Sequence, residues 1–262
     1  MNIGIIGCGH MGSAVANALI SQQLGKIHIS NPIKPRLDTG GHFTWTPDNA
    51  STVRASDIIV LAVRPAVIAP VLEEIRPLLK PAQVLISIAA GIPLKKLQKF
   101  SGNHKKIVRV MPNLAAQVCE GISVWQATNG CTKEDKKAIS SLLNSFGKSI
   151  EAANEELIDI ATAVGGGGPA YTAAFLESMS NAAINIGFSE EDARLLAMQS
   201  VLGSIKYLQK TGMSFEELKN AVQTKGGTTE AGFKVLKNKK WQRTLEKALL
   251  TGYKRARKIS KW

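Results

Sequence analysis

Cysteine and histidine are scarce in this chain, and neither is spaced to hold a metal ion. The sequence of 262 residues contains three cysteines (Cys8, Cys119 and Cys131) and four histidines. An odd number of cysteines without metal-ligand spacing is typical of reduced cytosolic thiols. We therefore expect free thiols, a cytoplasmic location and no bound metal.

Long hydrophobic runs are also missing. No apolar stretch approaches the ~18–20 residues that a membrane-spanning helix needs. The N-terminus enters an apolar strand without a basic region ahead of it, so we expect no signal peptide. With 44% hydrophobic residues, the chain has ample material for one or two folded domains.

Acidic residues are outnumbered, and the formal net charge at pH 7 is +13. Such an excess is compatible with a nucleic-acid partner. However, the densest basic run, at 234–261, alternates with apolar residues as an amphipathic helix does. We favour a solvated helix face and a surface suited to anionic substrates and cofactors, with no nucleic-acid partner. A nucleic-acid-binding protein stays the alternative.

A glycine motif near the N-terminus is the feature around which the first half is organised. The apolar run at 3–6 is followed by Gly7, Gly9 and Gly12, and then by apolar residues at helical spacing. Strand, glycine turn and helix form the context that a dinucleotide-binding G-x-G-x-x-G motif requires. Gly7 permits the sharp turn, Gly9 lets a pyrophosphate approach, and Gly12 lets the helix pack closely. The alternative is a structural turn without a ligand.

Strand and helix patterns alternate over about the first 150 residues, which predicts a doubly wound α/β fold. The fully apolar run at 58–63 suits a parallel sheet covered on both faces. The expected strands after the first are 26–30, 58–63, 83–88, 106–110, 122–126 and 148–152. We therefore predict a Rossmann-like, doubly wound parallel sheet, with a capping box at 132–135 opening one of its helices.

Strand patterns stop after Asn154, and helical patterns replace them. We expect a helix at 155–163, an interruption by the four glycines at 165–168, and a resumed helix at 170–186 with Pro169 in its first turn. Capping boxes at 189–192 and 214–217 open two further helices. We predict an NADP-binding domain at 1–154 and an all-α dimerisation and substrate-binding domain at 155–262.

The expected helix at 170–186 has an apolar surface wide enough for two partners. Tyr171, Phe175, Met179 and Ile186 belong to this surface. A helical half of about 108 residues forms only a small core, which cannot bury every face. We therefore predict that these helices pack against another subunit.

The end of the second expected strand bears on the choice of cofactor. In dinucleotide folds, an acidic residue about 20 positions after the glycines binds the ribose 2′-hydroxyl and selects NAD. Here Ser30, Asn31, Lys34 and Arg36 come before the first carboxylate, Asp38. Hydroxyl, amide and cations suit a 2′-phosphate better, so we predict NADP(H) in preference to NAD(H). Ordinary loop charges at the two cations are the alternative.

Three short motifs follow expected strands, at 62–65, 88–91 and 111–113. Ligands bind at the carboxyl ends of strands in open α/β sheets. Small residues such as Ala89 and Ala90 let the backbone approach a cofactor. Plain turn chemistry also accounts for proline and glycine at these positions.

The stretch 224–229, Thr-Lys-Gly-Gly-Thr-Thr, is the most chemically distinctive part of the second half. Gly226 and Gly227 expose backbone N–H groups just before a helix, with threonine hydroxyls around them. This pattern predicts a cradle for a carboxylate. Thr228 or Thr229 also suits the N-cap position of a helix that begins near Glu230.

Together these stretches resemble the Δ1-pyrroline-5-carboxylate reductase family. The likeness covers nearly the whole chain and lies at 5–12, 62–65, 87–91, 109–113, 167–171 and 226–229. The resemblance implies a Rossmann domain, then a helical domain that forms homodimers, which in the family often assemble into decamers. It implies NAD(P)H-dependent reduction of a cyclic imine to L-proline, the last step of proline biosynthesis.

The resemblance also implies which residues form the site. It places at the cofactor Ile6, Gly7, Cys8, Gly9, His10, Met11, Gly12, Asn31, Asn49, Ala62, Val63, Arg64, Ala89 and Ala90. It places at the substrate carboxylate Thr224, Gly226, Gly227, Thr228 and Thr229. Thr229 takes the catalytic role, as a hydrogen-bond partner near the ring nitrogen. A protonated imine is already electrophilic, so the protein has mainly to orient two rings, and no strong acid is needed.

The chain departs from the family pattern around the substrate positions. Four glycines at 165–168 replace Ser-Gly-Ser-Gly, and Thr224-Lys225 replaces Ser-Pro. A reductase of another cyclic imine or imino acid therefore remains an alternative, as does a non-catalytic NADP-binding protein. A β-hydroxyacid dehydrogenase is disfavoured, because that class uses a lysine in the long interdomain helix and 155–186 contains none.

Overall fold

The computed structural model describes residues 1–37 and 42–260, so Asp38 and Lys261 lie outside the described residues. The chain divides into two compact units, Met1–Pro169 with Gly252–Trp262, and Ala170–Thr251. The first unit holds the sheet and the second is helical. The predicted domain boundary after residue 154 is a different division of the chain and stays a prediction.

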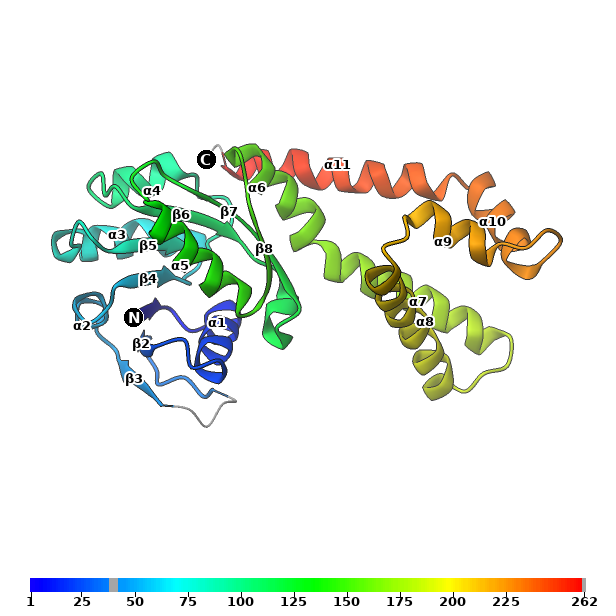
Figure 1. The fold of residues 1–262 in the computed structure, drawn as a ribbon, viewed down its shortest axis with the longest axis horizontal. Helices are drawn as coiled ribbons and strands as arrows, with labels where there is room; N and C mark the ends of the chain where they lie inside the picture. Colours follow the sequence, from blue (N-terminus) through cyan, green and yellow to red (C-terminus); the bar gives the residue numbers. More distant parts are fainter. Residues whose placement is uncertain (38–41, 261–262) are drawn as a thin grey trace. The chain divides into compact units, whose positions relative to one another are not determined.

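In the described residues the sheet of the first unit has eight strands, and strands are drawn as arrows in Figure 1. They are β1 (Asn2–Ile6), β2 (Lys26–Ser30), β3 (Phe43–Thr46), β4 (Ile58–Leu61), β5 (Val84–Ser87), β6 (Ile107–Met111), β7 (Gly121–Ala127) and β8 (Gly147–Glu151). Their order is β3-β2-β1-β4-β5-β6-β7-β8. Within the described residues, neighbouring strands run parallel except for β6 and β7, which are antiparallel. The predicted Rossmann-like sheet is therefore confirmed, with one antiparallel pair near its edge.

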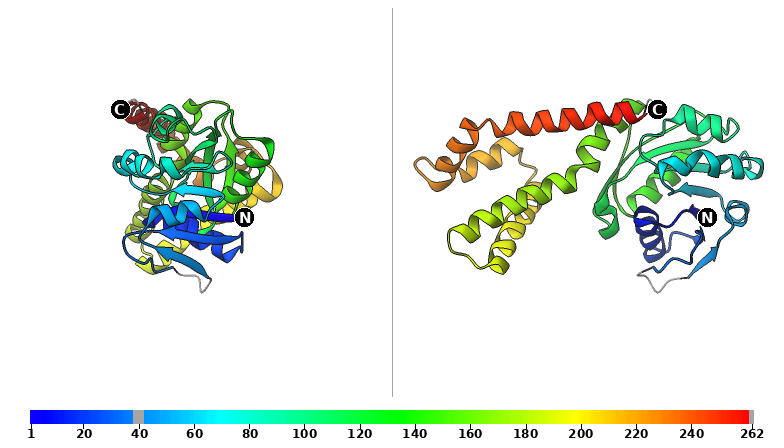
Figure 2. Two further views of the ribbon diagram at one scale, coloured as in Figure 1. Left: turned by 90° about the vertical axis from the view of Figure 1, so that its left-hand side faces the viewer. Right: turned by 180° about the vertical axis from the view of Figure 1, so that it is seen from behind.

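Helices cover both faces of this sheet, as Figures 1 and 2 show from three directions. The helices are α1 (His10–Ser21), α2 (Asn49–Arg54), α3 (Ile68–Ile75), α4 (Leu94–Phe100), α5 (Lys133–Asn144) and α6 (Glu155–Ala161). Side chains alternate across the sheet, since successive strand residues point to opposite faces. Ile58 packs in one buried cluster with residues of α1 and α5, whereas Ile59 packs in the other with residues of α3 and α4. This two-sided burial explains why β4 is wholly apolar.

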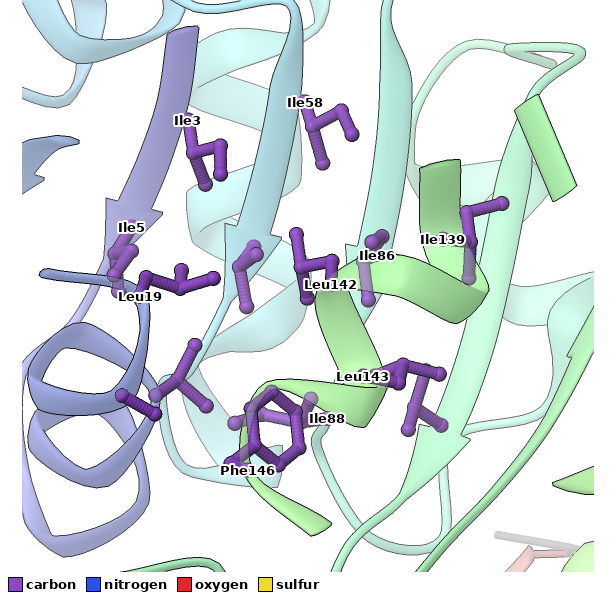
Figure 3. Packing of buried hydrophobic residues seen from close by; sticks show 14 of the residues in the cluster. Ile3, Ile5, Leu19, Ile58, Ile86, Ile88, Ile139, Leu142, Leu143 and Phe146 are labelled. Atoms are coloured by element: carbon purple, nitrogen blue, oxygen red, sulfur yellow. The ribbon is translucent and has the colours of Figure 1, made fainter. Parts of the chain in front are cut away.

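The cluster under α1 and α5 is drawn in Figure 3. Ile3 and Ile5 of β1, Leu19 of α1 and Leu142 of α5 are at most 1% exposed. Fully burying one such side chain contributes roughly 1.5–3 kcal/mol. The core therefore fixes β1, and with it the glycine turn that follows β1.

Strand β3 was not among the expected strands. Its sequence, Phe-Thr-Trp-Thr, is rich in β-forming aromatic and threonine side chains. It is only four residues long and pairs with β2 at the sheet edge. A short, partly polar strand carries no apolar run, so the pattern used for the buried strands did not detect it.

The glycine run at 165–168 does not break the helix, contrary to the expectation. The chain continues from α6 into a π-helical turn, Thr162–Gly166, and then into α7 (Gly168–Asn185). The side-chain amide of Asn113 donates to the carbonyl of Gly165 at 3.2 Å. Asn113 also accepts from the N–H of Ile122 of β7, at 3.1 Å. This support from distant residues lets glycines stay helical where local propensity predicts a break.

The second unit is built from α7, α8 (Glu190–Thr211), α9 (Phe215–Val222), α10 (Thr228–Asn238) and the first part of α11 (Trp241–Ser260). Ser189 and Ser214 cap α8 and α9 through their hydroxyls, as the sequence predicts. Large apolar side chains are exposed here: Phe175 by 51%, Leu195 by 63% and Phe215 by 84%. Exposure on this scale marks an interaction surface.

No described helix combines the length and apolarity that crossing a bilayer requires. No group of three or more cysteine, histidine and acidic side chains in the described residues is arranged to hold a metal ion.

Candidate functional site

A cavity of about 510 Å³ lies where β1, β4 and β5 end, in the first unit. It is lined by Gly7, Cys8, Gly9, His10, Met11, Asn31, Ala62, Val63, Arg64, Pro65, Val67, Ile88, Ala89 and Ala90. β1 is the point where the strand order reverses, with β2 on one side and β4 on the other. Crevices at such switch points are where open α/β sheets bind ligands.

The three glycines of the turn have the geometry that their motif predicts. Gly7 has φ +90°, a conformation that favours glycine. A Cβ on Gly12 would lie 2.3 Å from the carbonyl oxygen of Gly7, so only glycine lets α1 approach the turn. A Cβ on Gly9 would meet no atom of the described residues within 4 Å, which leaves space for a ligand over the backbone.

α1 begins directly after this turn. The first N–H groups of a helix have no partner within the helix, and those of α1 face the glycine turn. Gly9 is the N-cap, no side chain caps it, and the first turn of α1 contains no acidic residue. The partial positive charge at the start of α1 is therefore not neutralised by an acidic side chain in the first turn of α1. The exposed Arg64 adds a cation to the lining. Space, N–H donors and positive charge fit a pyrophosphate.

Asn31 ties the end of β2 to the glycine turn. Its Oδ1 accepts from the N–H of Cys8 at 3.0 Å, and its Nδ2 donates to the carbonyl of Ile33 at 2.7 Å. The indole N–H of Trp45 donates to the Asn31 carbonyl at 3.0 Å. Asn31 thus lines the cavity with its orientation fixed, at the position where an acidic residue selects NAD.

Cys8 is a half-buried thiol inside the turn. Burial raises its pKa to about 11, because the thiolate loses solvation. The thiol is therefore protonated near neutral pH and unsuited to act as a nucleophile. Cys8 packs, partly buried, against the core cluster that contains Ile3 and Leu19, which agrees with a packing role.

Three predicted cofactor residues do not line the cavity. Ile6 is buried in the sheet and Gly12 lies behind the turn. Asn49 accepts from the hydroxyl of Ser30 at 2.7 Å and donates to Glu74 at 3.0 Å. Direct cofactor contact by these three residues stays a prediction. Lys34 and Arg36 are exposed and are not among the lining residues described, so their contribution also stays a prediction.

Val67 of the lining lies outside the predicted motifs, and Pro65 and Ile88 belong to the motifs at 62–65 and 88–91 without a predicted role at the site. Pro65 and Val67 are the first and last residues of a 3₁₀ turn that follows Arg64. Ile88 follows β5 directly. Their positions just after strands could have predicted that they line the site, because ligands bind at the carboxyl ends of the strands in such sheets.

The stretch 224–229 forms a tight turn before α10, in the second unit. Gly226 has φ +75°, and its N–H donates to Oε2 of Glu230 at 2.7 Å. The N–H of Gly227 donates to the carbonyl of Thr224 at 3.0 Å. A pocket of about 300 Å³ beside the turn is lined by Asn220, Gln223, Thr224, Lys225 and Glu230.

The N-cap of α10 differs from the expectation. Gly227 is the N-cap and no side chain caps it, while Thr228 and Thr229 are already helical. The expected threonine cap is therefore wrong. The acidic side chain of Glu230, which the sequence analysis did not single out, closes the turn instead. The threonine hydroxyls consequently need not serve as the cap.

Comparisons with known proteins place these features in one family. Residues 155–259 match the model for pyrroline-5-carboxylate reductase dimerisation, and residues 2–91 match the model for NADP oxidoreductase, coenzyme F420-dependent. Pyrroline-5-carboxylate reductase of Glycine max is 35% identical to this chain, with 98% of this chain and 96% of the relative covered. The chain belongs to the pyrroline-5-carboxylate reductase family.

Solved structures of the reductase family agree over the full length. The Coxiella burnetii reductase superposes with a TM-score of 0.93 at 32% identity, covering 99% of this chain and 98% of the other. The Plasmodium falciparum enzyme, solved with NADP bound, gives 0.89 at 31% identity with the same coverage. An Aquifex aeolicus prephenate dehydrogenase, at 16% identity and a TM-score of 0.52, shares the fold alone.

Proposed function

We propose that the protein reduces Δ1-pyrroline-5-carboxylate to L-proline with NADPH. The observation that carries this proposal is the match to curated reductases along nearly the whole chain, which includes both glycine turns. The cavity supplies room, N–H donors and a cation for a dinucleotide. The turn at 224–229 supplies threonine hydroxyls, and the N–H groups of Thr228 and Thr229 at the start of α10, for a small carboxylate.

NADPH, when bound, supplies the hydride that reduces the C=N bond of the ring. The protein's own groups bind and orient. The turn at 7–12 and Arg64 hold the phosphates, and the small side chains of Ala89 and Ala90 leave room for the other half of the cofactor. Orientation of this kind is the main contribution that hydride transfer to an activated imine requires.

The N–H groups of Gly226 and Gly227 already donate within the chain. We therefore assign the substrate carboxylate to the N–H groups of Thr228 and Thr229, at the start of α10, and to the hydroxyls of the turn at 224–229. Thr229 is half-buried in the first turn of α10, and we assign its Oγ1 to a hydrogen bond at the ring nitrogen. Lys225 lines the neighbouring pocket, where its ammonium group adds a positive charge near the carboxylate.

The protein acts as a homodimer in this proposal, in the cytoplasm. It carries the dimerisation region of the family at 155–259, and the exposed Phe175, Leu195 and Phe215 give that region an apolar surface to bury. Three free cysteines suit a reducing compartment. Assembly of dimers into a decamer stays an expectation from the family. Light scattering at micromolar concentration is expected to give a dimer or a larger species, and a monomer would contradict the proposal.

The activity is tested by following NADPH absorbance with pyrroline-5-carboxylate, and in parallel with six-membered ring imines and open-chain imino acids. We expect the five-membered ring to give the highest kcat/KM. A higher kcat/KM for another ring would assign the altered stretches at 165–168 and 224–225 to a different substrate. NADPH binding without turnover of any imine would leave a non-catalytic NADP-binding protein.

A further inference from the structure

A buried arginine in the first unit connects the cofactor cavity to the end of the chain. Arg109 lies in β6, and its side chain is 3% exposed. Its Nη1 donates to Oε1 of Glu155 at 2.9 Å, and its Nη2 donates to Oδ1 of Asp159 at 2.7 Å. Burying a charge without partners is costly, so two carboxylates and further hydrogen bonds make this position possible.

Glu155 connects Arg109 to the loop that lines the cavity. Its Oε1 also accepts from the backbone N–H of Leu94, at 2.9 Å. Leu94 is the first residue of α4, and the loop before it carries Ile88, Ala89 and Ala90 of the cavity lining. Arg109 therefore fixes, through one carboxylate, the point at which this loop ends.

The end of α11 holds the same loop from another direction. Nη2 of Arg109 also donates to the hydroxyl of Ser260 at 3.3 Å, and that hydroxyl donates to Asp159 at 2.8 Å. Ile259 lies so close to Gly91 that a Cβ there would stand 2.4 Å from its Cγ2 atom. Gly91 follows Ala90 directly and has φ +76°. The close approach thus needs glycine at this position.

This loop lies on the nicotinamide side of the predicted cofactor. In the dinucleotide fold the pyrophosphate lies at the glycine turn after β1, and the adenosine ribose lies at the end of the next strand, here at Asn31. The strand order places β5 beyond β4, on the opposite side of β1 from β2. The other half of a dinucleotide therefore extends towards Ala89 and Ala90.

We propose that Arg109 is a positioning residue for the cofactor, which holds the Ala89–Ala90 backbone at the nicotinamide half through Glu155 and the end of α11. The proposal rests on the proposed function for the identity of the cofactor. It assigns the family's Arg-Val-Met-Pro-Asn stretch, residues 109–113, a task beyond forming β6. It also gives the last residues of α11 a part in cofactor binding.

The test compares two ligands that share the adenosine half. NADPH is titrated by its fluorescence, and adenosine 2′,5′-bisphosphate by calorimetry. In Arg109→Gln we expect the Kd for NADPH to rise about tenfold, the effect of losing hydrogen bonds to a charged group. The Kd for the bisphosphate is expected to stay within about twofold, because Asn31 and the glycine turn are untouched. Arg109→Lys keeps the charge and is expected to restore part of the NADPH affinity.

Removing a buried cation leaves Asp159 without a counter-charge, and Arg109→Gln is therefore paired with a milder variant. Ile259→Ala removes only the side chain against Gly91, and we expect about a threefold rise in the Kd for NADPH with the bisphosphate unchanged. Arg257→Gln is the matched control. Arg257 lies two residues before Ile259 on α11, pairs with Glu156 at 3.8 Å and is half-exposed, so both affinities are expected to stay as in wild type.

Either of two results would overturn the proposal. One is an unchanged NADPH affinity in Ile259→Ala and in any folded variant at Arg109. The other is an equal loss of both ligands, which means a general loss of structure rather than a displaced loop. Should the wild type bind NADPH but reduce no imine, the proposed function fails, while the two-ligand comparison still decides the role of Arg109.

Discussion

The two glycine turns of this protein precede helices in similar ways but differ in charge. Gly9 caps α1 and Gly227 caps α10, each without a side-chain cap. The first turn of α1 contains no acidic residue, whereas that of α10 contains Glu230, whose carboxylate accepts from the N–H of Gly226. The glycine turn before α1 therefore keeps its positive helix end for a strongly charged anion such as a pyrophosphate. At the glycine turn before α10, Glu230 partly neutralises the positive helix end, which suits a single carboxylate.

The largest expected loss of NADPH binding at the first glycine turn is at Gly12. In Gly12→Ala, the new Cβ stands 2.3 Å from the Gly7 carbonyl, and such overpacking costs about 1–3 kcal/mol. We expect a lower Tm and a rise of at least about 100-fold in the Kd for NADPH, since the phosphate turn itself is displaced. Thermal unfolding and fluorescence titration measure the two effects.

Gly9→Ala and Gly203→Ala are compared with Gly12→Ala, because a Cβ at either glycine meets no atom of the described residues within 4 Å. Gly9→Ala is expected to keep the Tm but lose about tenfold in NADPH affinity, since its Cβ fills ligand space. Gly203→Ala, in α8, is expected to keep the NADPH affinity and to raise the Tm slightly, because alanine favours a helix interior over glycine. Equal NADPH affinity in all three variants would mean that the turn does not bind the cofactor.

The second turn is tested at Thr229. Thr229→Ala removes the hydroxyl assigned to the ring nitrogen, and kcat/KM is expected to fall by roughly one to two orders of magnitude. Steady-state kinetics against pyrroline-5-carboxylate measures the loss. Thr251→Ala is the matched control, since that hydroxyl donates to the carbonyl of Lys247 in the preceding turn of α11. An unchanged kcat/KM in Thr229→Ala would remove Thr229 from the mechanism.

Cofactor choice sharpens the account of the first turn. In Asn31→Asp a carboxylate replaces the amide that lines the cavity, and it repels a 2′-phosphate while accepting from a 2′-hydroxyl. We expect the ratio of kcat/KM for NADPH over NADH to fall about tenfold. A wild-type enzyme that already uses NADH as efficiently as NADPH would contradict the predicted preference.

The smallest expected effect concerns Glu230. Glu230→Gln removes the negative charge but keeps an oxygen that can accept from Gly226. A carboxylate inhibitor without a ring cation, tetrahydrofuran-2-carboxylate, is expected to bind about threefold more tightly, as for one charge at a helix terminus. Inhibition constants measure this change. Weaker binding would show that the carboxylate shapes the turn instead of competing with the ligand.

Much of the first unit follows from local sequence signals. The glycine spacing, the apolar run of β4 and the capping box at Thr132 each act within a few residues, and each forms as predicted. Strand β3 was missed because four residues at a sheet edge carry no apolar run. The π-helical turn was missed because the support for its glycines comes from Asn113, more than fifty residues away along the chain.

The contacts at the site are less predictable. Arg109 finds Glu155, Asp159 and Ser260 at separations of 46, 50 and 151 residues, and no local pattern links them. Glu230 appears in the sequence as an ordinary first-turn acid, which favours any helix N-terminus. Its bond to Gly226 depends on the left-handed backbone of that glycine. The residue patterns located both turns, but the hydrogen bond between Glu230 and Gly226 emerged only from the structure.

The most direct test of the central claim follows the transferred hydrogen itself. The protein is incubated with pyrroline-5-carboxylate and NADPH in which both hydrogens at C4 of the nicotinamide are deuterium, and the amino-acid product is analysed by mass spectrometry and NMR. The account predicts L-proline with one deuterium on C5, the former imine carbon. Proline without deuterium, or NADPH that binds and is never oxidised, would contradict it.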